Sequence, residues 1–111
     1  MQTYGVALKR EGIEKIFISE NDIICIKPQE LSFKMIYRSA VGVYWNDEEN
    51  YLYHNQAQNW SFFQSFEHIV KAVKIEYGVQ LKIMPNTIYE NLDDCTILTI
   101  KKTFSYSRVC P

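Results

Sequence analysis

The sequence is poor in the residues that interrupt regular structure. Its 111 residues include only four Gly and three Pro. No GxGxxG or Walker-type phosphate loop is present, and four isolated glycines cannot build the standard cradle for a dinucleotide pyrophosphate. We therefore expect no nucleotide cofactor, and no residue pattern indicates any other cofactor.

Cysteine is scarce as well. Cys25, Cys95 and Cys110 are odd in number and widely spaced, which speaks against both a disulfide framework and a zinc knuckle. The acidic stretch from Asp47 to Glu49 lacks the alternating oxygen ligands and the glycine of a calcium loop. We therefore expect no metal site, and we interpret Cys25, within the apolar run 23–26, as a small buried hydrophobe.

Long runs of one charge or of apolar residues are also missing. The 12 basic and 13 acidic residues are spread along the chain, whereas a protein that tracks phosphates usually carries a basic stripe. No apolar run approaches the roughly 18 residues that cross a bilayer, and the segment Met1–Gly5 lacks the layout of a secretory signal. We expect neither nucleic acid nor a membrane as a partner, and we expect a cytoplasmic protein of bacterial type.

What the chain does have is apolar and aromatic content. Hydrophobic residues make up 47% and charged residues 23%, the balance of an ordinary globular protein. Aromatic residues reach 14%, with eight Tyr, and aromatic side chains pack well on pleated strands. The length fits one domain over residues 1–111.

The segments before residue 60 favour strands. The clearest alternation covers residues 31–37 and places Leu31, Phe33, Met35 and Tyr37 on one side, which we expect to face the core. Pro28 should end a short β-branched strand, because proline removes a ladder donor. The expected strands are 4–8, 13–19, 23–27, 31–37, 41–45 and 51–54.

The last two of these strands flank the polar loop 46–50 and predict a hairpin. Pairing symmetric about a five-residue loop would leave one hairpin side facing solvent or a partner, around Tyr44, Leu52 and His54. The expected partners are Trp45 with Tyr51, Val43 with Tyr53, Tyr44 with Leu52, and Gly42 with His54.

One amphipathic helix follows, over about residues 61–77. Ser61 and Gln64 have capping-box spacing, although Asn59 could cap slightly earlier, and Gly78 provides a left-handed stop. An apolar stripe fits a helical period and runs through Phe62, Phe63, Phe66, Ile69, Val70, Val73 and Tyr77.

After the helix, strands are expected over 79–83, ending at Pro85, and over 95–101 and 103–109, with a weaker one over 87–91. Strands segregated around one helix predict an α+β fold: an antiparallel, mostly meander sheet packed on that single long helix.

Catalytic signatures are missing. No GxSxG elbow brings a serine to a base. His68 is expected on the solvated side of the helix, and His54 ends a strand beside a loop, where site residues are common. Enzymatic activity is therefore the less favoured interpretation.

Surplus aromatic residues give the leading functional hypothesis. Residues 37–60 carry more large rings than one sheet face can easily bury, although packing of all of them in the core is the simpler interpretation, because aromatic residues in strands usually pack there. Exposed Tyr and Trp often dominate interaction surfaces. We expect a non-enzymatic interaction module, an adaptor, regulator or neutraliser that binds another protein or a second copy of itself. The residues proposed to bind are Tyr37, Tyr44, Leu52, His54 and Trp60.

The alternative is a protein that binds or converts a small ligand in a pocket between the helix and a curved sheet, with His54 and Tyr hydroxyls pointing into it. In overall style, the small Tyr-rich α+β chain without a catalytic signature resembles proteins encoded by the mobile gene cassettes of integrons, and also small immunity proteins. The resemblance covers the whole chain loosely and is carried by no particular residues. It implies an accessory, interaction-based role and transfers no site residues.

Overall fold

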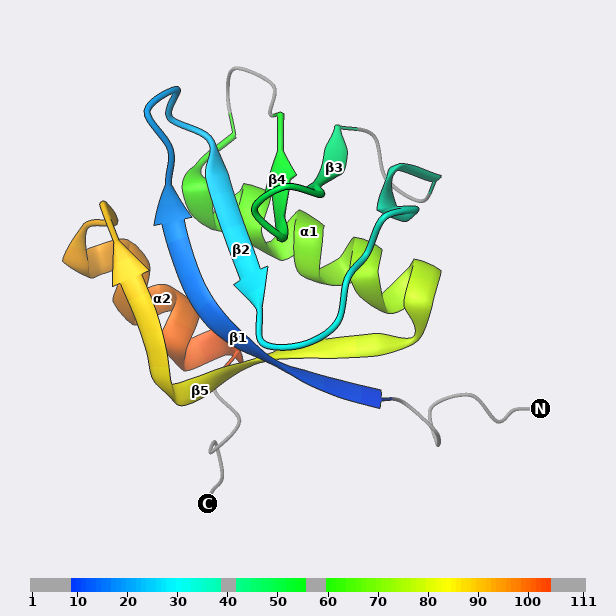
Figure 1. The fold of residues 1–111 in the computed structure, drawn as a ribbon. Helices are drawn as coiled ribbons and strands as arrows, with labels where there is room; N and C mark the ends of the chain where they lie inside the picture. The colour runs from blue at the N-terminus through cyan, green and yellow to red at the C-terminus, as the bar shows by residue number, and fades with distance from the viewer. Residues whose placement is uncertain (1–8, 39–41, 56–59, 105–111) are drawn as a thin grey trace.

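The computed structural model describes residues 9–38, 42–55 and 60–104, which form an α+β fold (Figure 1). One sheet has the strand order β3-β4-β2-β1-β5. Helix α1 contacts β2, β4 and β5, and helix α2 contacts α1 and β5, so both helices lie on one side of the sheet. The elements are β1 (Lys9–Ile18), β2 (Ile24–Pro28), β3 (Val43–Asn46), β4 (Tyr51–His54), α1 (Phe62–Tyr77), β5 (Val79–Glu90) and α2 (Asp94–Phe104).

The sheet is mixed, so the prediction of a wholly antiparallel sheet was wrong. The pairs β1–β2, β2–β4 and β3–β4 are antiparallel, but β5 lies parallel to β1. The reason is α1, which connects β4 to β5 as a crossover along the rear of the sheet (Figure 1). A crossover helix returns the chain in a parallel sense. The expected strand 4–8 lies outside the described residues.

Both strands of the parallel pair are interrupted at one level. The register passes from Ile13 opposite Ile83 directly to Lys15 opposite Ile88. Pro85 lies in the extra length of β5 and lacks a ladder donor, but the strand resumes beyond it instead of ending there. Thr87 links the two strands at this irregularity. Its hydroxyl donates a hydrogen bond to the carbonyl of Ile13 on β1 (2.7 Å) and accepts one from the amide of Met84 on β5 (2.8 Å).

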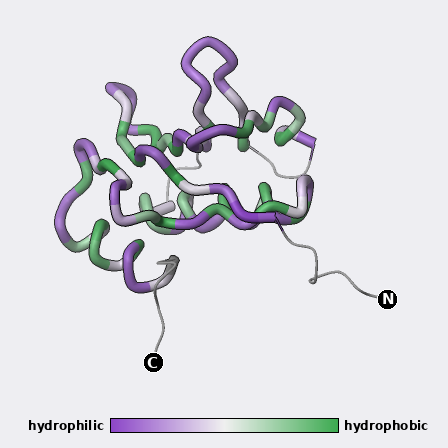
Figure 2. Tube along the Cα trace, turned by 60° about the horizontal axis from the view of Figure 1, so that its bottom comes forward, coloured by the Kyte–Doolittle hydropathy of each residue, from purple (hydrophilic) through white to green (hydrophobic). Residues whose placement is uncertain are grey.

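Helix α1 confirms the helix expected over 61–77. Ser61 caps its N-terminus in a complete capping box with Gln64, and Gly78 ends it at φ 66°. Phe66, Ile69, Val70 and Val73 are buried against the sheet. Figure 2 shows the resulting pattern, with apolar stretches on the helix and the inner strands and hydrophilic stretches at the turns.

Residues 31–37 are not the strand that their alternation predicts. They form turns and a short 3-10 helix, Ile36–Arg38. Phe33 and Ile36, three residues apart, point into the core, whereas Met35 and Tyr37 are exposed. The ring of Phe33 packs edge-on against Trp45 and Tyr77, and the amide of Met35 donates to the Tyr77 hydroxyl (2.8 Å). Contacts with distant residues therefore overrode the local period of two.

Residues 95–101 are also not the strand expected there, because they form most of α2. Asp93 accepts hydrogen bonds from the amide (3.3 Å) and the hydroxyl (2.6 Å) of Thr96, as a helix-capping residue does. Ile100 is buried in the common core. The described residues thus form two α-helices instead of one. The expected strand 103–109 begins within α2 and otherwise lies outside the described residues.

Candidate functional site

The side of the sheet away from the helices carries a row of side chains that crosses all five strands. Strand pairing aligns Glu90 with Phe17, Phe17 with Cys25, Cys25 with Tyr53, and Tyr53 with Tyr44. Side chains that are paired across strands share one face of a sheet. The neighbouring row on the same face contains Ile88, Lys15, Lys27, Tyr51 and Asn46.

Four aromatic rings on this face form a connected surface, which we call the tyrosine face: Phe17, Tyr44, Tyr51 and Tyr53. Ring centroids lie 5.2 Å apart for Phe17 and Tyr51, 6.1 Å for Tyr51 and Tyr53, and 5.7 Å for Tyr44 and Tyr53. Such spacings are typical of favourable aromatic pairs. Tyr44 is 41% exposed and the other three rings are half-buried. The rings hold one another in place and still present area to solvent.

Charge borders the tyrosine face on its β1–β5 side. Lys15 Nζ lies 5.0 Å from the centroid of the Phe17 ring and 3.0 Å from a carboxylate oxygen of Glu90. Beneath the rings, Cys25 is only 1% exposed, and this burial raises the pKa of its thiol to about 12. Cys25 is thus the small buried hydrophobe that the sequence predicts, and its thiol is protonated at neutral pH.

The hairpin itself is confirmed, but its predicted register was wrong by one residue. Tyr44 pairs with Tyr53, and Trp45 pairs with Leu52, because the strands close around the four-residue loop 47–50. Asn50 makes this shorter loop with φ 61° and donates its amide to the carbonyl of Asn46 (2.8 Å). A slip of one residue exchanges the two faces of a strand.

The five residues expected to bind therefore lie in different places. Leu52 (0% exposed) and His54 (3%) face the core, so Leu52 offers no surface to a partner. Tyr44 lies on the tyrosine face, Tyr37 is 54% exposed on the 3-10 helix, and Trp60 lies just before α1. The structure brings only Trp60 and His54 together.

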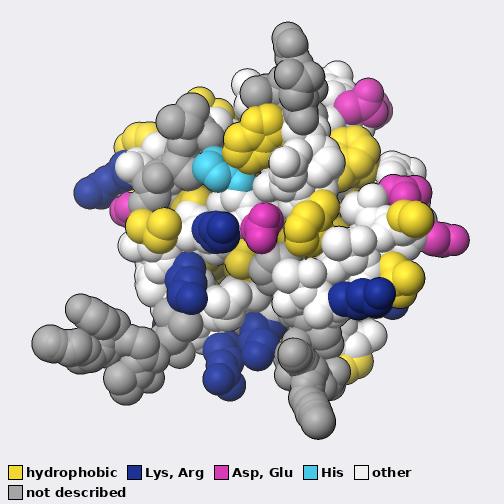
Figure 3. All heavy atoms as spheres, turned by 180° about the vertical axis from the view of Figure 1, so that it is seen from behind, with side chains coloured by type: hydrophobic (Ala, Val, Ile, Leu, Met, Phe, Trp, Pro, Cys, Tyr) yellow, Lys and Arg dark blue, Asp and Glu magenta, His cyan; other side chains and the backbone are white. Residues whose placement is uncertain are grey.

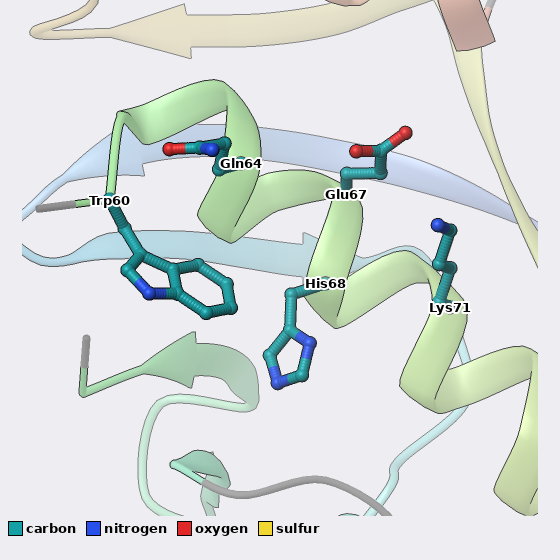
Figure 4. Close-up of a pocket in the computed structure, with 5 residues that line it drawn as sticks. All are labelled: Trp60, Gln64, Glu67, His68 and Lys71. Atoms are coloured by element: carbon teal, nitrogen blue, oxygen red, sulfur yellow. The ribbon is translucent and has the colours of Figure 1, made fainter. Parts of the chain in front are cut away.

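A second candidate site, the histidine pocket, lies on the polar side of α1. It has a volume of about 220 Å³ and is lined by Trp60, Gln64, Glu67, His68 and Lys71 (Figure 4). The Trp60 indole and the His68 imidazole extend to the same side of the helix in that view. Figure 3 shows histidine atoms at the surface next to hydrophobic, basic and acidic side chains.

His54 lies behind this pocket. Its ring centroid is 4.8 Å from that of Trp60 and 4.9 Å from that of His68, and His68 is 5.1 Å from Trp60. A Cβ added at Gly42, which has φ +81°, would lie 3.3 Å from His54 Cδ2 and Nε2. The glycine therefore leaves room for the imidazole.

The electrostatics of the pair favour a neutral His54. Burial, and after it the neighbouring His68, lower the pKa of His54 to about 4. Its Nδ1 lies 2.9 Å from the Ser65 hydroxyl, which is completely buried. A serine nucleophile must reach its substrate, so this His–Ser pair fits a structural bond better than acyl transfer.

Sequence reasoning missed the histidine pocket for a physical reason. Gln64, His68 and Lys71 are spaced three and four residues apart on one helix side, and this spacing was the one available signal. The contribution of Trp60 and the backing by His54 depend on how β4 packs on α1, which the local sequence does not specify.

The described residues contain neither a candidate metal-binding cluster nor a candidate membrane-spanning helix. No group of three or more His, Cys, Asp and Glu side chains that could hold a metal ion occurs in residues 9–38, 42–55 and 60–104. Within the same residues, no helix is both long enough and apolar enough to span a membrane.

Comparison with known proteins gives a family. A family model described as Integron Cassette Protein Hfx_Cass5 matches residues 11–87. This chain belongs to that family. A solved structure of Hfx_Cass5 itself, from the mobile metagenome of North West Arm Sewage Outfall, is 31% identical over 85% of this chain and 94% of its own, with a TM-score of 0.45. No curated protein matches this chain.

Membership of the Hfx_Cass5 family confirms the resemblance to integron mobile-gene-cassette proteins. The segment that matches the Hfx_Cass5 model includes all four rings of the tyrosine face and all five residues of the histidine pocket. The Hfx_Cass5 description names no ligand, partner or reaction, so the function has to be argued from the surfaces of this chain.

Proposed function

We propose that this cassette protein is a non-enzymatic interaction module that binds another protein on its tyrosine face. The observation that carries the proposal is the cross-strand row that ends in Tyr53 and Tyr44, on the side of the sheet that neither helix contacts. Tyr is enriched in binding hot spots, because its ring offers a large area with few rotatable bonds and a polar tip.

A second copy of the chain is the partner that we propose first. In the described part of the chain, β3 and β5 are the two edges of the sheet, and β3 places Tyr44 at the border of the tyrosine face. Open edges and uncovered sheet faces are commonly closed by a symmetric dimer. In such a dimer the rings of one copy pack against those of the other.

The test is sedimentation velocity of the wild type and of Tyr44→Ala over a range of protein concentrations. The proposal predicts concentration-dependent dimers for the wild type and a clear loss of association for Tyr44→Ala, with an unchanged circular dichroism spectrum. Ile75→Ala is the matched control, because Ile75 is a large, exposed apolar residue on α1. It should leave association intact.

Equal association of wild type and Tyr44→Ala would refute the tyrosine face as the self-association surface. Loss of association in Tyr37→Ala alone would move the surface to the 3-10 helix. A wild type that stays monomeric would remove the second copy as partner. The interaction role would then require that a different protein binds this chain and can be cross-linked to it at position 44.

The histidine pocket supports a second candidate function, the binding of a small ligand. The specific observation is that an indole, an imidazole and a lysine border one hollow of about 220 Å³ (Figure 4). Ligand binding there would quench or shift Trp60 fluorescence. Small aromatic and zwitterionic compounds are then screened against the wild type, His68→Gln and Lys71→Gln. If no compound changes the Trp60 fluorescence of the wild type more than that of the two variants, this candidate function is eliminated.

A further inference from the structure

A second hollow lies at the start of the parallel strand pair and shares no residue with the tyrosine face or the histidine pocket. It has a volume of about 340 Å³ and is lined by Arg10, Glu11, Gly12, Lys82 and Met84. Strand pairing places Arg10 beside Gln80 and Gly12 beside Lys82. Arg10 and Lys82 thus come from neighbouring strands and border one cleft.

The two cations of this cleft form no ion pair with an acid in the described part of the chain. The ion pairs found in residues 9–38, 42–55 and 60–104 join Lys15 to Glu90, Lys34 to Asp47 and Arg38 to Glu76. Arg10 and Lys82 take part in none of them. Two like charges that border one cleft, neither of them in these ion pairs, offer an anion a place to gain energy from both.

Glu11 lines the same cleft, but its carboxylate is hydrogen-bonded to backbone amides. The Glu11 side chain is buried, and its Oε2 accepts hydrogen bonds from the backbone amides of Glu30 and Leu31, the latter at 2.9 Å. Backbone N–H donors stabilise the carboxylate where it lies. Glu11 therefore anchors the chain after β2 and does not serve as the partner of Arg10 or Lys82.

Gly12 lets the wall of the cleft form. Its carbonyl accepts the amide of Gln29 (3.0 Å), and a Cβ at this position would collide with the Gln29 side chain and lie 2.9 Å from Met84 Cγ. The absence of a side chain allows the chain after β2 and Met84 to close in on β1. Met84 adds an apolar wall beside the two cations.

We propose that this cleft binds a small organic anion that carries phosphate or carboxylate groups. The Arg10 guanidinium offers the bidentate fork that such groups prefer, and Lys82 adds a mobile point charge. The volume lies at the lower end of the range for small-molecule sites, roughly 300–1,000 Å³. This leaves space for a small carbon skeleton against Met84.

The experiment is calorimetric titration of the full chain with glycerol 3-phosphate, with inorganic phosphate and with citrate, in chloride buffer at constant ionic strength. The three probes separate a need for a carbon skeleton from a need for charge alone, and phosphate from carboxylate. Arg10→Gln and Lys82→Gln should each lower the affinity by about ten-fold or more, the scale of a lost charge-assisted hydrogen bond. Lys74→Gln, which removes an exposed lysine of α1 that lines neither hollow, is the matched control and should bind like wild type. Lys71→Gln is measured as well, to report on the histidine pocket.

Thermal unfolding supplies a second readout that a merely structural role would not produce. Without ligand, Arg10→Gln should unfold at about the same temperature as wild type, because Arg10 is exposed and takes part in none of the ion pairs found in the described residues. With glycerol 3-phosphate, the unfolding temperature of the wild type should rise more than that of Arg10→Gln. The comparison with the variant is needed because phosphate and citrate also stabilise proteins by exclusion from their surface.

Three outcomes would overturn the proposal. One is the absence of saturable binding of all three probes, and another is equal binding by wild type, Arg10→Gln and Lys82→Gln. A loss of binding in Lys71→Gln alone would assign the anion to the histidine pocket. None of these results bears on self-association through Tyr44, so this proposal and the proposed function fail separately.

Discussion

The imidazole Nδ1 of His54 lies 2.9 Å from the hydroxyl of Ser65 and thereby joins the end of β4 to the first turns of α1. Both side chains are buried. Buried polar groups that lack a partner cost roughly 1–3 kcal/mol, so this bond contributes to how the sheet and the helix fit together. It also holds the imidazole where the rings of Trp60 and His68 meet it.

Acidification should destabilise the protein through His54. Its pKa is about 4 in the folded chain and about 6.5 when unfolded, so only the unfolded chain binds the proton between these values. Stability must then fall as the pH falls through this window. The loss from pH 7.5 to pH 5 should be about 2 kcal/mol, measured by urea unfolding at a series of pH values.

His54→Gln and His68→Gln test the origin of that loss. His54→Gln should have a flatter stability profile over the same range, whatever its stability at pH 7.5. His68→Gln removes the neighbouring charge that lowers the pKa of His54, so the total loss of stability should become smaller and should level off at a higher pH. A profile for His54→Gln as steep as that of the wild type would assign the pH dependence to other groups.

Removal of the Ser65 hydroxyl should destabilise the protein at neutral pH. In Ser65→Ala the buried Nδ1 of His54 loses its partner across the sheet–helix interface, and the expected cost is about 1–2 kcal/mol after the gain in helix propensity. Thr99→Ala is the control, because its hydroxyl donates to the Cys95 carbonyl (2.9 Å) on an exposed part of α2. Equal stability of both variants and the wild type would mean that the His54–Ser65 bond contributes nothing.

Truncation of the hairpin residues distinguishes the two registers. Leu52 is completely buried and pairs with Trp45 and Ile26, so Leu52→Ala should cost about 2–5 kcal/mol. Tyr44→Ala, on the tyrosine face, should cost less than about 1 kcal/mol. The register expected from the sequence makes Leu52 a surface residue and predicts a small cost for both. Chemical unfolding of the two variants decides between them.

The residues that sequence reasoning placed correctly are those whose signals are local and agree with one another. Ser61, Gln64, Gly78 and the apolar stripe all specify the same helix, and α1 begins and ends as they predict. The hairpin is equally local, but its register depends on whether Asn46 belongs to the loop or to the strand. That single residue decides whether Leu52 or Tyr53 faces outward.

The residues placed wrongly depend on distant contacts. Met35 and Tyr37, expected in the core, are exposed because the segment turns where Phe33 packs against Trp45 and Tyr77. The β-branched segment after Asp93 becomes helical because Ile100 reaches the core shared with α1 and β5. The tyrosine face was expected as an excess of rings, but its actual members follow from strand pairing. His68 was assigned to the solvated side of α1, and only the packing of β4 brings it to His54.

The two described cysteines should differ sharply in reactivity. Cys95 is exposed on α2, whereas Cys25 is buried beneath Tyr51 and Tyr53 with a pKa of about 12. Relative to the ordinary value of 9.0, this pKa alone lowers the thiolate fraction of Cys25 about a thousand-fold. Iodoacetamide at pH 8, followed by peptide mass spectrometry, should therefore label Cys95 long before Cys25.

The same labelling makes Cys25 a reporter of the tyrosine face. Tyr53 is the cross-strand neighbour of Cys25, so Tyr53→Ala should open a path to the thiol and raise its labelling rate, while that of Cys95 stays constant. Tyr37→Ala, which removes a ring outside this face, should change neither rate. A Cys25 that is labelled as fast as Cys95 in the wild type would show that the rings do not cover the thiol, and the tyrosine face would then lack the ordered packing that the binding proposal requires.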